Sequence, residues 1–397
     1  MNIPEYKTIA GLRLPDVKVG ENEWQICVDS TNEDEVHAYA RLLEAEGFVR
    51  HAAREIPGGS ARPYNVNLYY MYKNEEIYVS MSFSAALRTV QICRGPVRFI
   101  GPGEERIETV RRVVPSVTQC RLDKSGMCYA VQTEDGKFIL IDGGLYSEAD
   151  AERLYAFLCE KTPSDQKPEV SMWVFTHPDV DHLELATAFL STYHEKVDIS
   201  AFVYQFPNME TVHFMYQDNE EIKGDMEALQ KNIKTYYPKA AIYTPHTGAV
   251  YRLSGAEMEF LWTGEMSYPC MYLTANDFSL ALRFRFSGGR TALIFGDAMQ
   301  PALRRMSATY GDYLKSDVLQ VTHHGLIGGE RTTYELIDPG ICLWATSEKR
   351  FSGVLEGQTY QWCIGEGGCD YNRWIRDDSV RPRQHYAQGE STTVLMD

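Results

Sequence analysis

Four side chains that commonly bind metal ions fall within the six residues HPDVDH, at positions 177–182. The preceding apolar run, SMWVF, lacks alternation and is typical of a strand buried on both faces. A helical pattern begins directly afterwards, so the cluster follows the carboxyl end of a strand, where α/β sheets usually hold ligands. On an extended segment His177 and Asp179 point the same way. The turn into the helix redirects Asp181 and His182, so the four side chains can serve two adjacent cations, one pair each.

Taken singly, these side chains also have a plain structural interpretation. Asp179 or Asp181 could cap the following helix, and His177 could be a buried histidine with satisfied hydrogen bonds. Distant segments favour the metal site, because three further apolar strands end in similar side chains. They are FILI before Asp142, LIF before Gly296 and Asp297, and LQV before Thr322, His323 and His324. Strands that each end in ligand-type residues predict one shared cluster.

The segment HPDVDH resembles the H-x-H/D-x-D-H signature of the metallo-β-lactamase superfamily. Four more segments resemble the branch that contains hydrolase domains of competence-type DNA-uptake proteins and phosphorylcholine esterases. They are IDGG (141–144), NDFSL (276–280), FGDA (295–298) and THHG (322–325). These segments occur in the family's order and extend over about residues 113–347, more than half of the chain. The first 100 residues are not covered by the resemblance.

The resemblance implies a site for two divalent metal ions. His177 and Asp179 would hold the first ion, and Asp181 and His182 the second. Asp297 would bridge both ions, and His323 would complete the second site. Asp142 would orient a ligand from outside the coordination sphere. Asp181 and His324 are the residues expected to take part in catalysis, with His324 as a donor to the substrate oxyanion.

Two departures from the superfamily pattern concern the metal and its ligands. Asp179 stands where many zinc members have histidine, and a site rich in carboxylates shifts the preference from zinc towards manganese or iron. The family's middle histidine ligand is not obvious among His194, His213 and His246. His246, in the turn TPHTG just before a strand, is the best placed of the three. A capping or solvent-facing role for His246 is an equally open alternative.

The elements that must position these residues divide the chain into three parts. Residues 1–100 predict a small α+β domain of unknown role, with a helix in DEVHAYARLLEAEGF and strands in NVNLYYMYKN and EEIYVSMSFS. The Gly- and Pro-rich sequence at the start of residues 101–112 and just before them predicts that this stretch is a linker. Residues 113–397 predict strands flanked by helices, and DISAFVYQF is expected to be one of the strands. The expected α/β (α+β) fold is a four-layer αββα metallo-β-lactamase sandwich preceded by the small domain. The aromatic residues of EGQTYQWCIGEGGCDYNRW could form loops over the site or pack on a sheet edge.

Composition and charge narrow the class of substrate and the location. The formal net charge of −16 repels polyanions, so a small-molecule substrate is favoured over long nucleic acid. No run approaches the roughly 20 apolar residues needed to cross a bilayer, and the first residues lack a signal-peptide pattern. We expect a cytoplasmic protein without membrane partners, for which an oligomer is possible.

These observations lead to one main hypothesis and two alternatives. The main hypothesis is a metal-dependent hydrolase with two divalent ions (zinc, manganese or iron) and a hydroxide nucleophile, acting on a small phosphodiester. The first alternative is hydrolysis of a carboxylic ester, thioester or lactone by the same centre. The second alternative is a catalytically silent metal-binding or interaction protein.

Overall fold

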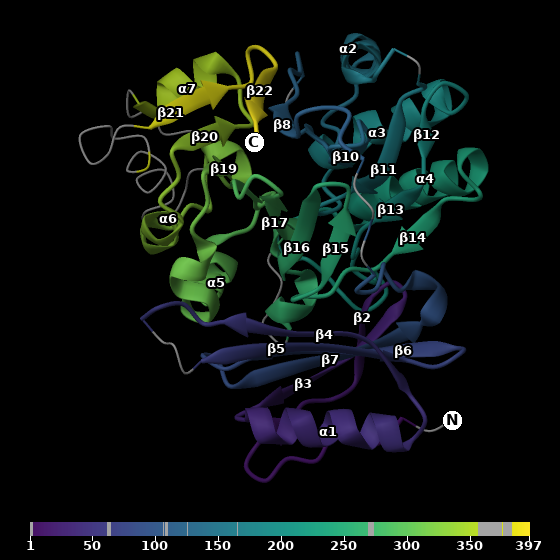
Figure 1. The fold of residues 1–397 in the computed structure, drawn as a ribbon, viewed down its shortest axis with the longest axis vertical. Helices are drawn as coiled ribbons and strands as arrows, with labels where there is room; N and C mark the ends of the chain where they lie inside the picture. The colour runs from purple at the N-terminus through teal and green to yellow at the C-terminus, as the bar shows by residue number, and fades with distance from the viewer. Residues whose placement is uncertain are drawn as a thin grey trace.

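The computed structural model describes residues 3–61, 65–105, 107, 110–124, 126–164, 166–268, 274–355, 375 and 383–397. The described residues form three β-sheets with helices packed on them (Figure 1). The segment EGQTYQWCIGEGGCDYNRW, which was expected to lie over the site or on a sheet edge, lies outside the described residues. No helix in the described part of the chain is both long and apolar enough to cross a membrane.

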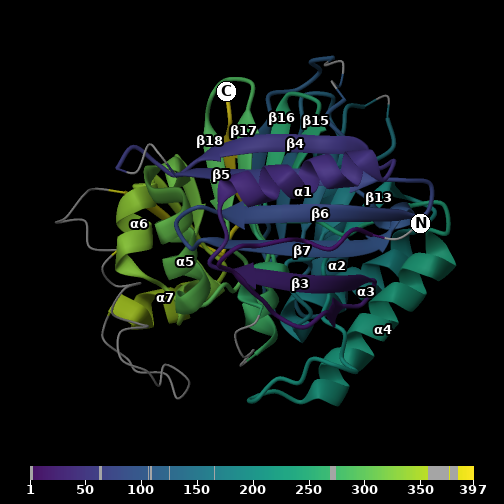
Figure 2. The ribbon, with the colours of Figure 1, turned by 90° about the horizontal axis from the view of Figure 1, so that it is seen from below.

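The first sheet belongs to the N-terminal region and carries one helix. Its strands are β1 (Leu12–Arg13), β2 (Val17–Gly20), β3 (Glu23–Asp29), β4 (Val49–Pro57), β5 (Val66–Lys73), β6 (Ile77–Ser84) and β7 (Thr89–Pro96). They pair in the order β1-β3-β7-β6-β5-β4, with β2 on β3. Helix α1 (Glu33–Ala45) begins at Asn32, whose side chain accepts a hydrogen bond from the backbone N–H of Glu35. The helix lies across one face of this sheet, where Val36, Tyr39 and Leu43 are buried (Figure 2).

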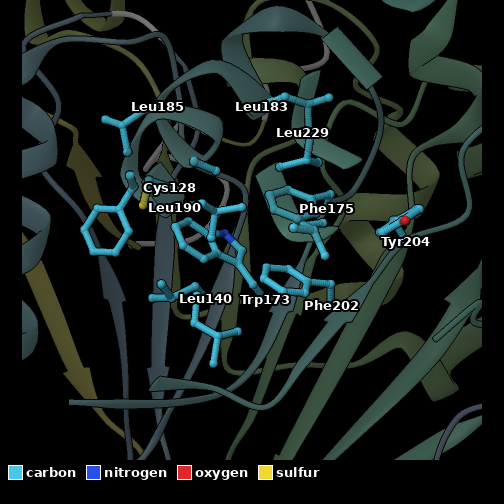
Figure 3. Close-up of a cluster of buried hydrophobic side chains, with 14 of the residues drawn as sticks. Cys128, Leu140, Trp173, Phe175, Leu183, Leu185, Leu190, Phe202, Tyr204 and Leu229 are labelled. Atoms are coloured by element: carbon cyan, nitrogen blue, oxygen red, sulfur yellow. The ribbon is translucent and has the colours of Figure 1, made fainter. Parts of the chain in front are cut away.

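The second sheet is the first of the two sheets of the sandwich along the chain, and helices cover its outer face. Its strands are β8 (Ser116–Gln119), β9 (Tyr129–Gln132), β10 (Phe138–Ile141), β11 (Glu169–Val174), β12 (Asp198–Ile199), β13 (Ala201–Val203), β14 (Ala241–Tyr243) and β22 (Thr392–Leu395). Their order is β14-β13-β11-β10-β9-β8-β22, with β12 on β11. The helices are α2 (Glu148–Lys161), α3 (Val180–Tyr193) and α4 (Asn219–Tyr236). Figure 3 shows Trp173, Phe175 and Phe202 lying among leucines of these helices. The strand expected over residues 198–206 is shorter than predicted, because it is divided into β12 and β13 at Ser200.

The third sheet faces the second and is covered by the later helices. Its strands, in their spatial order, are β15 (Val250–Leu253), β16 (Ala256–Trp262), β17 (Ala281–Phe286), β18 (Thr291–Ile294), β19 (Val318–Gln320), β20 (Ile341–Trp344) and β21 (Gln384–Ala387). Helices α5 (Gln300–Tyr310), α6 (Arg331–Ile337) and α7 (Glu348–Leu355) follow strands of this sheet. The short 3₁₀ turns are η1 (Val97–Phe99), η2 (Gly264–Ser267), η3 (Ala275–Phe278), η4 (Gly311–Leu314) and η5 (His323–Gly325).

Three buried clusters define the layers of the sandwich. One cluster lies between the two sheets and joins residues such as Val131, Ile141 and Phe284. The second sheet packs on α2, α3 and α4, and the third sheet packs on α5 and α6. The expected four-layer αββα sandwich, preceded by an α+β unit, is therefore confirmed. The described residues between 101 and 112 contain no helix or strand.

The N-terminal sheet also contacts the sandwich through hydrogen bonds. Ser82 donates to the backbone carbonyl of Thr247 at 2.7 Å, and Asn67 donates to the carbonyl of Thr309 at 3.1 Å. The sheet thus packs α1 on one face, and on the other it contacts the loop at Thr247 and the end of helix α5 in the sandwich.

Candidate metal centre

The predicted ligands meet because parallel strands of both sheets end at the same edge of the sandwich. In the second sheet β10 and β11 are parallel, and they lead into Asp142 and His177. In the third sheet β18 and β19 are parallel, and they lead into Asp297 and the paired histidines. Helix α3 begins within the HPDVDH segment and adds Asp181 and His182. Residues more than 100 positions apart in the chain are thereby brought into contact.

Two groups of ligand-type side chains form the centre. The first group is His177, His182 and Asp297, and the second is Asp181, His182 and His324. Within each group the ligand atoms lie within 4.8 Å of one another. The Oδ2 atom of Asp297 is 3.4 Å from Nε2 of His182 and 3.2 Å from Nε2 of His324. His182 therefore belongs to both groups, and Asp297, a member of the first group, also lies beside His324 of the second.

Several buried polar atoms of this centre have no hydrogen-bond partner. They are Nε2 of His177, His182 and His324, and Oδ1 of Asp297. Buried polar atoms are nearly always satisfied in folded proteins, so four unsatisfied atoms in one place indicate a missing ligand. Imidazole nitrogens and carboxylate oxygens are the donors that zinc, manganese and iron accept. The residues present therefore fit divalent cations.

Asp142 fixes the tautomers of two histidines. Its Oδ2 atom accepts a hydrogen bond from Nδ1 of His182 at 2.7 Å and from the hydroxyl of Thr176 at 2.6 Å. Because the Thr176 hydroxyl donates to Asp142, it accepts from Nδ1 of His177, at 3.0 Å. Both rings thus carry their proton on Nδ1 and leave Nε2 bare for a cation. Asp142 thus supports both rings from the side opposite Nε2, and its orienting role at a metal stays a prediction.

The paired histidines occupy different positions. Both have left-handed backbone conformations, with φ of 49° at His323 and 56° at His324, which is uncommon for residues other than glycine. Nδ1 of His324 donates to the carbonyl of Ala345 at 2.8 Å, so its Nε2 faces Asp181 and Asp297, each at 3.2 Å, where a cation would take the place of a proton. His323 is more exposed, and its Nε2 is 3.5 Å from Asp297. We expected His323 as the ligand and His324 as the substrate donor, whereas this geometry favours the reverse.

Asp179 lies beside the first group and does not cap the helix. It occupies the N-cap position of α3, but its side chain accepts no hydrogen bond from the helix backbone. Its carboxylate accepts from Nε2 of Gln217 at 3.2 Å, and its Oδ2 is 3.5 Å from Nε2 of His177. The carboxylate is thus held towards His177 by a side chain from outside the motif.

The electrostatics of the centre favour positive charge. Burial alone would lower the pKa of His324, but Asp297 and Asp181 raise it to about 10. Burial likewise opposes the charged form of Asp297, yet His324, His323 and His182 hold its pKa well below the ordinary value. The pKa of Asp181 is also lowered, because His182 and His324 outweigh the effect of burial. Without cations the carboxylates recruit protons, so divalent ions would compete with protons for these sites.

The prediction that His246 completes this centre needs correction. His246 follows β14, and β13 separates β14 from β11 in the sheet. Two strand spacings displace it along the edge by roughly 10 Å. Its ring instead lies in a separate buried group with Glu23, Cys93 and Glu265. Of the other two histidines considered, Nδ1 of His194 is 3.0 Å from the carbonyl of Ser191, as expected near a helix end.

Some residues that shape the centre were missed in the sequence. Thr176 links Asp142 to His177, and its position directly before His177 was a signal that could have been used. Gln217 holds Asp179, and the hydroxyl of Ser279 accepts from the backbone N–H of Asp297 at 3.1 Å. Gln217 lies in a loop without any pattern, so nothing local in the sequence indicated its role.

Comparisons with known proteins give distant structural likenesses only. No protein-family model matches the sequence, and no curated protein matches it. One similar structure is CmlA, a diiron β-hydroxylase from Streptomyces venezuelae, with 13% identity and a TM-score of 0.40 over 73% of this chain. The match covers 55% of CmlA, so this chain spans about half of that protein's length.

Two further similar structures are shorter proteins. A metallo-β-lactamase with a HARLDQ motif from Cronobacter sakazakii is 13% identical, with 68% of this chain and 97% of that chain covered and a TM-score of 0.35. A possible metal-dependent hydrolase from Veillonella parvula DSM 2008 is 11% identical, with 71% and 100% covered and a TM-score of 0.36.

Proposed function

We propose that this chain is a metal-dependent hydrolase of the metallo-β-lactamase type that cleaves a small phosphodiester with the help of two divalent cations. The observation that carries the proposal is the set of bare, buried Nε2 atoms around Asp297. Such an arrangement is costly unless a ligand satisfies it.

Each side chain has a distinct role in the proposal. His177 and Asp179 would hold one cation, and Asp181, His182 and His324 the other. Asp297 lies within 3.5 Å of three imidazoles and would bridge the two ions. Asp142 and Thr176 keep the rings of His182 and His177 oriented. The three aspartates favour manganese or iron over zinc.

Two bound cations would lower the pKa of a water towards about 7 and would neutralise charge on the substrate. In the proposal His323, at the more exposed side of the centre, would donate a hydrogen bond to the substrate or its leaving group. Burial lowers the pKa of His323, which favours the neutral form of its ring. The net charge of −16 favours a small substrate over a polyanion.

The proposal is tested with the purified full chain and manganese. We expect hydrolysis of bis-p-nitrophenyl phosphate, which Asp181→Ala abolishes and the matched control Asp34→Ala, at an exposed position of α1, leaves unchanged. Turnover of thioesters or lactones but not of phosphodiesters would support the acyl alternative. Failure of the protein to bind any divalent ion would overturn the hydrolase proposal and leave an interaction protein.

A further inference from the structure

A second group of ligand-type side chains lies inside the junction between the N-terminal sheet and the sandwich. Glu23 comes from β3, Cys93 from β7, His246 from the loop after β14, and Glu265 from η2. All four are buried, with at most 2% of any residue exposed. One ligand atom from each lies within 4.8 Å of the others. Four segments from two parts of the chain thus meet at one buried point.

The spacing of these atoms suits a small cation. Nδ1 of His246 is 3.5 Å from Oε1 of Glu23, and Sγ of Cys93 is 3.3 Å from Oε2 of Glu265. Donors bound tetrahedrally at zinc distances are separated by about 3.3–3.6 Å. Nδ1 of His246 is closer to Oε2 of Glu265, at 2.7 Å, because the two atoms share a proton. Replacing that proton by an ion would lengthen this contact.

Each carboxylate is held by one oxygen and faces the group with the other. Oε1 of Glu265 accepts from the hydroxyl of Ser82 at 3.0 Å and from the backbone N–H of Thr247 at 2.9 Å. Oε2 of Glu23 accepts from Nε2 of Gln205 at 2.8 Å. Such outer donors commonly orient metal-ligating carboxylates. The remaining oxygens, Oε1 of Glu23 and Oε2 of Glu265, point to His246.

The charges of the group also call for a cation. In the part of the chain that the structure describes, His246 is the only cationic partner of Glu23 and Glu265. Burying two carboxylates beside a single imidazole costs free energy, because one imidazolium balances only one of the two negative charges.

We propose that Glu23, Cys93, His246 and Glu265 bind one divalent transition-metal ion of the zinc class. Four protein ligands in a buried setting describe a structural site, without an open position for substrate. On binding, the imidazolium of His246 loses its Nδ1 proton and keeps the proton on Nε2, and Cys93 loses its thiol proton. Both protons go to solvent, while metal–nitrogen and metal–sulfur bonds form. The ion would fasten the N-terminal sheet to the sandwich.

Cobalt substitution separates this site from the candidate catalytic centre. No cysteine belongs to that centre among the described residues, whereas the second site contains Cys93. A thiolate bound to Co²⁺ gives a charge-transfer band in the near ultraviolet, and oxygen and nitrogen ligands do not. We expect the full chain loaded with Co²⁺ to show this band and to bind one more equivalent of metal than the catalytic centre holds.

Three variants assign the band. Cys93→Ser should remove the band and one equivalent of metal, whereas Cys27→Ser, an equally buried thiol of the same sheet, should change neither. Asp297→Asn should weaken the catalytic centre and leave the band intact. A Co²⁺-saturated unmodified chain without the band, or a band that persists in Cys93→Ser, would overturn the proposal. This outcome is independent of whether the chain hydrolyses any substrate.

Discussion

At the scale of single residues, the candidate centre depends on which ring nitrogen of each histidine carries the proton. His182, His177 and His324 each have an acceptor at Nδ1, supplied by Asp142, Thr176 and the carbonyl of Ala345. A neutral imidazole with its proton fixed on Nδ1 has only Nε2 available as a ligand. The three bare nitrogens therefore follow from the hydrogen bonds behind them.

Asp142→Asn tests this control of the tautomers. The amide can donate a hydrogen bond towards Nδ1 of His182, which would move the ring proton to Nε2 and block the ligand atom. We expect metal affinity to fall about 10–100-fold, measured by titration against a competing chelator. Asp150→Asn, another buried aspartate that accepts backbone hydrogen bonds, is the control. Equal affinity in Asp142→Asn and the parent would show that Asp142 is not needed for orientation.

The two adjacent histidines give opposite expectations. His324→Ala removes a nitrogen that faces both Asp181 and Asp297, so we expect loss of bound metal. His323→Ala should retain the metal and lose about 10²–10⁴-fold in turnover, the usual range for a proton donor. Metal content per chain and turnover number of each variant, measured together, check the assignment. Metal loss in His323→Ala with retention in His324→Ala would restore the original expectation from the sequence.

At the scale of elements, the backbone after strand β18 has to pass close to the end of strand β11. Gly296 precedes Asp297 with φ of 56°, and a Cβ atom there would lie 2.8 Å from the side chain of Thr176. Glycine is therefore required both by the conformation and by the close approach of two strands from different sheets.

Gly296→Ala should lower the free energy of unfolding by more than about 1–2 kcal/mol, the cost of the left-handed conformation alone. The added methyl group should also displace Thr176 and reduce metal binding. Gly289→Ala is the matched control, because Gly289 also has positive φ but nothing lies within 4 Å of its Cβ position. Urea unfolding of both variants makes the comparison. Equal losses of stability with full metal binding would contradict the proposed contact.

Helices α3 and α4 bring like charges together, and this predicts a dependence on pH. Burial, Glu221 and Glu184 raise the pKa of Asp225 from 3.8 to about 6. A carboxyl with a raised pKa in the folded state stabilises the protein below its unfolded pKa, and that stability is lost as pH rises through about 6.

Asp225→Asn should therefore be more stable than the parent above this pH range and lose its advantage below it. The gain should stay under about 1 kcal/mol, because the group is partly exposed and screened. Urea unfolding across the pH range measures the difference, with the exposed Asp34→Asn as control. A constant difference at all pH values would contradict the assignment.

The residues at the strand ends could be predicted well from the sequence, whereas the order of neighbouring strands in each sheet could not. Apolar runs that stop at Asp142, His177, Asp297 and His323 are local patterns, so the convergence of these residues could be expected. The position of His246 depends on which strands are neighbours, and this order is set by contacts between distant segments. The support of Asp179 by Gln217 and the group with Glu23 and Cys93 depend on such contacts too. They could not be predicted from spacing along the chain.

At the scale of the whole molecule, the strands of both sheets of the sandwich end side by side at one edge. The N-terminal sheet packs against the sandwich. The hydrolase proposal depends on the first of these arrangements, and the proposed structural metal on the second. The two claims involve different residues, so each can fail without the other.

Anomalous X-ray scattering from crystals of the manganese-loaded full chain tests the central claim most directly. We predict two manganese peaks about 3.5–4 Å apart, with Asp297 between them and the Nε2 atoms of His177, His182 and His324 in contact. Crystals saturated with manganese that show no ordered ion at these nitrogen atoms would contradict the account.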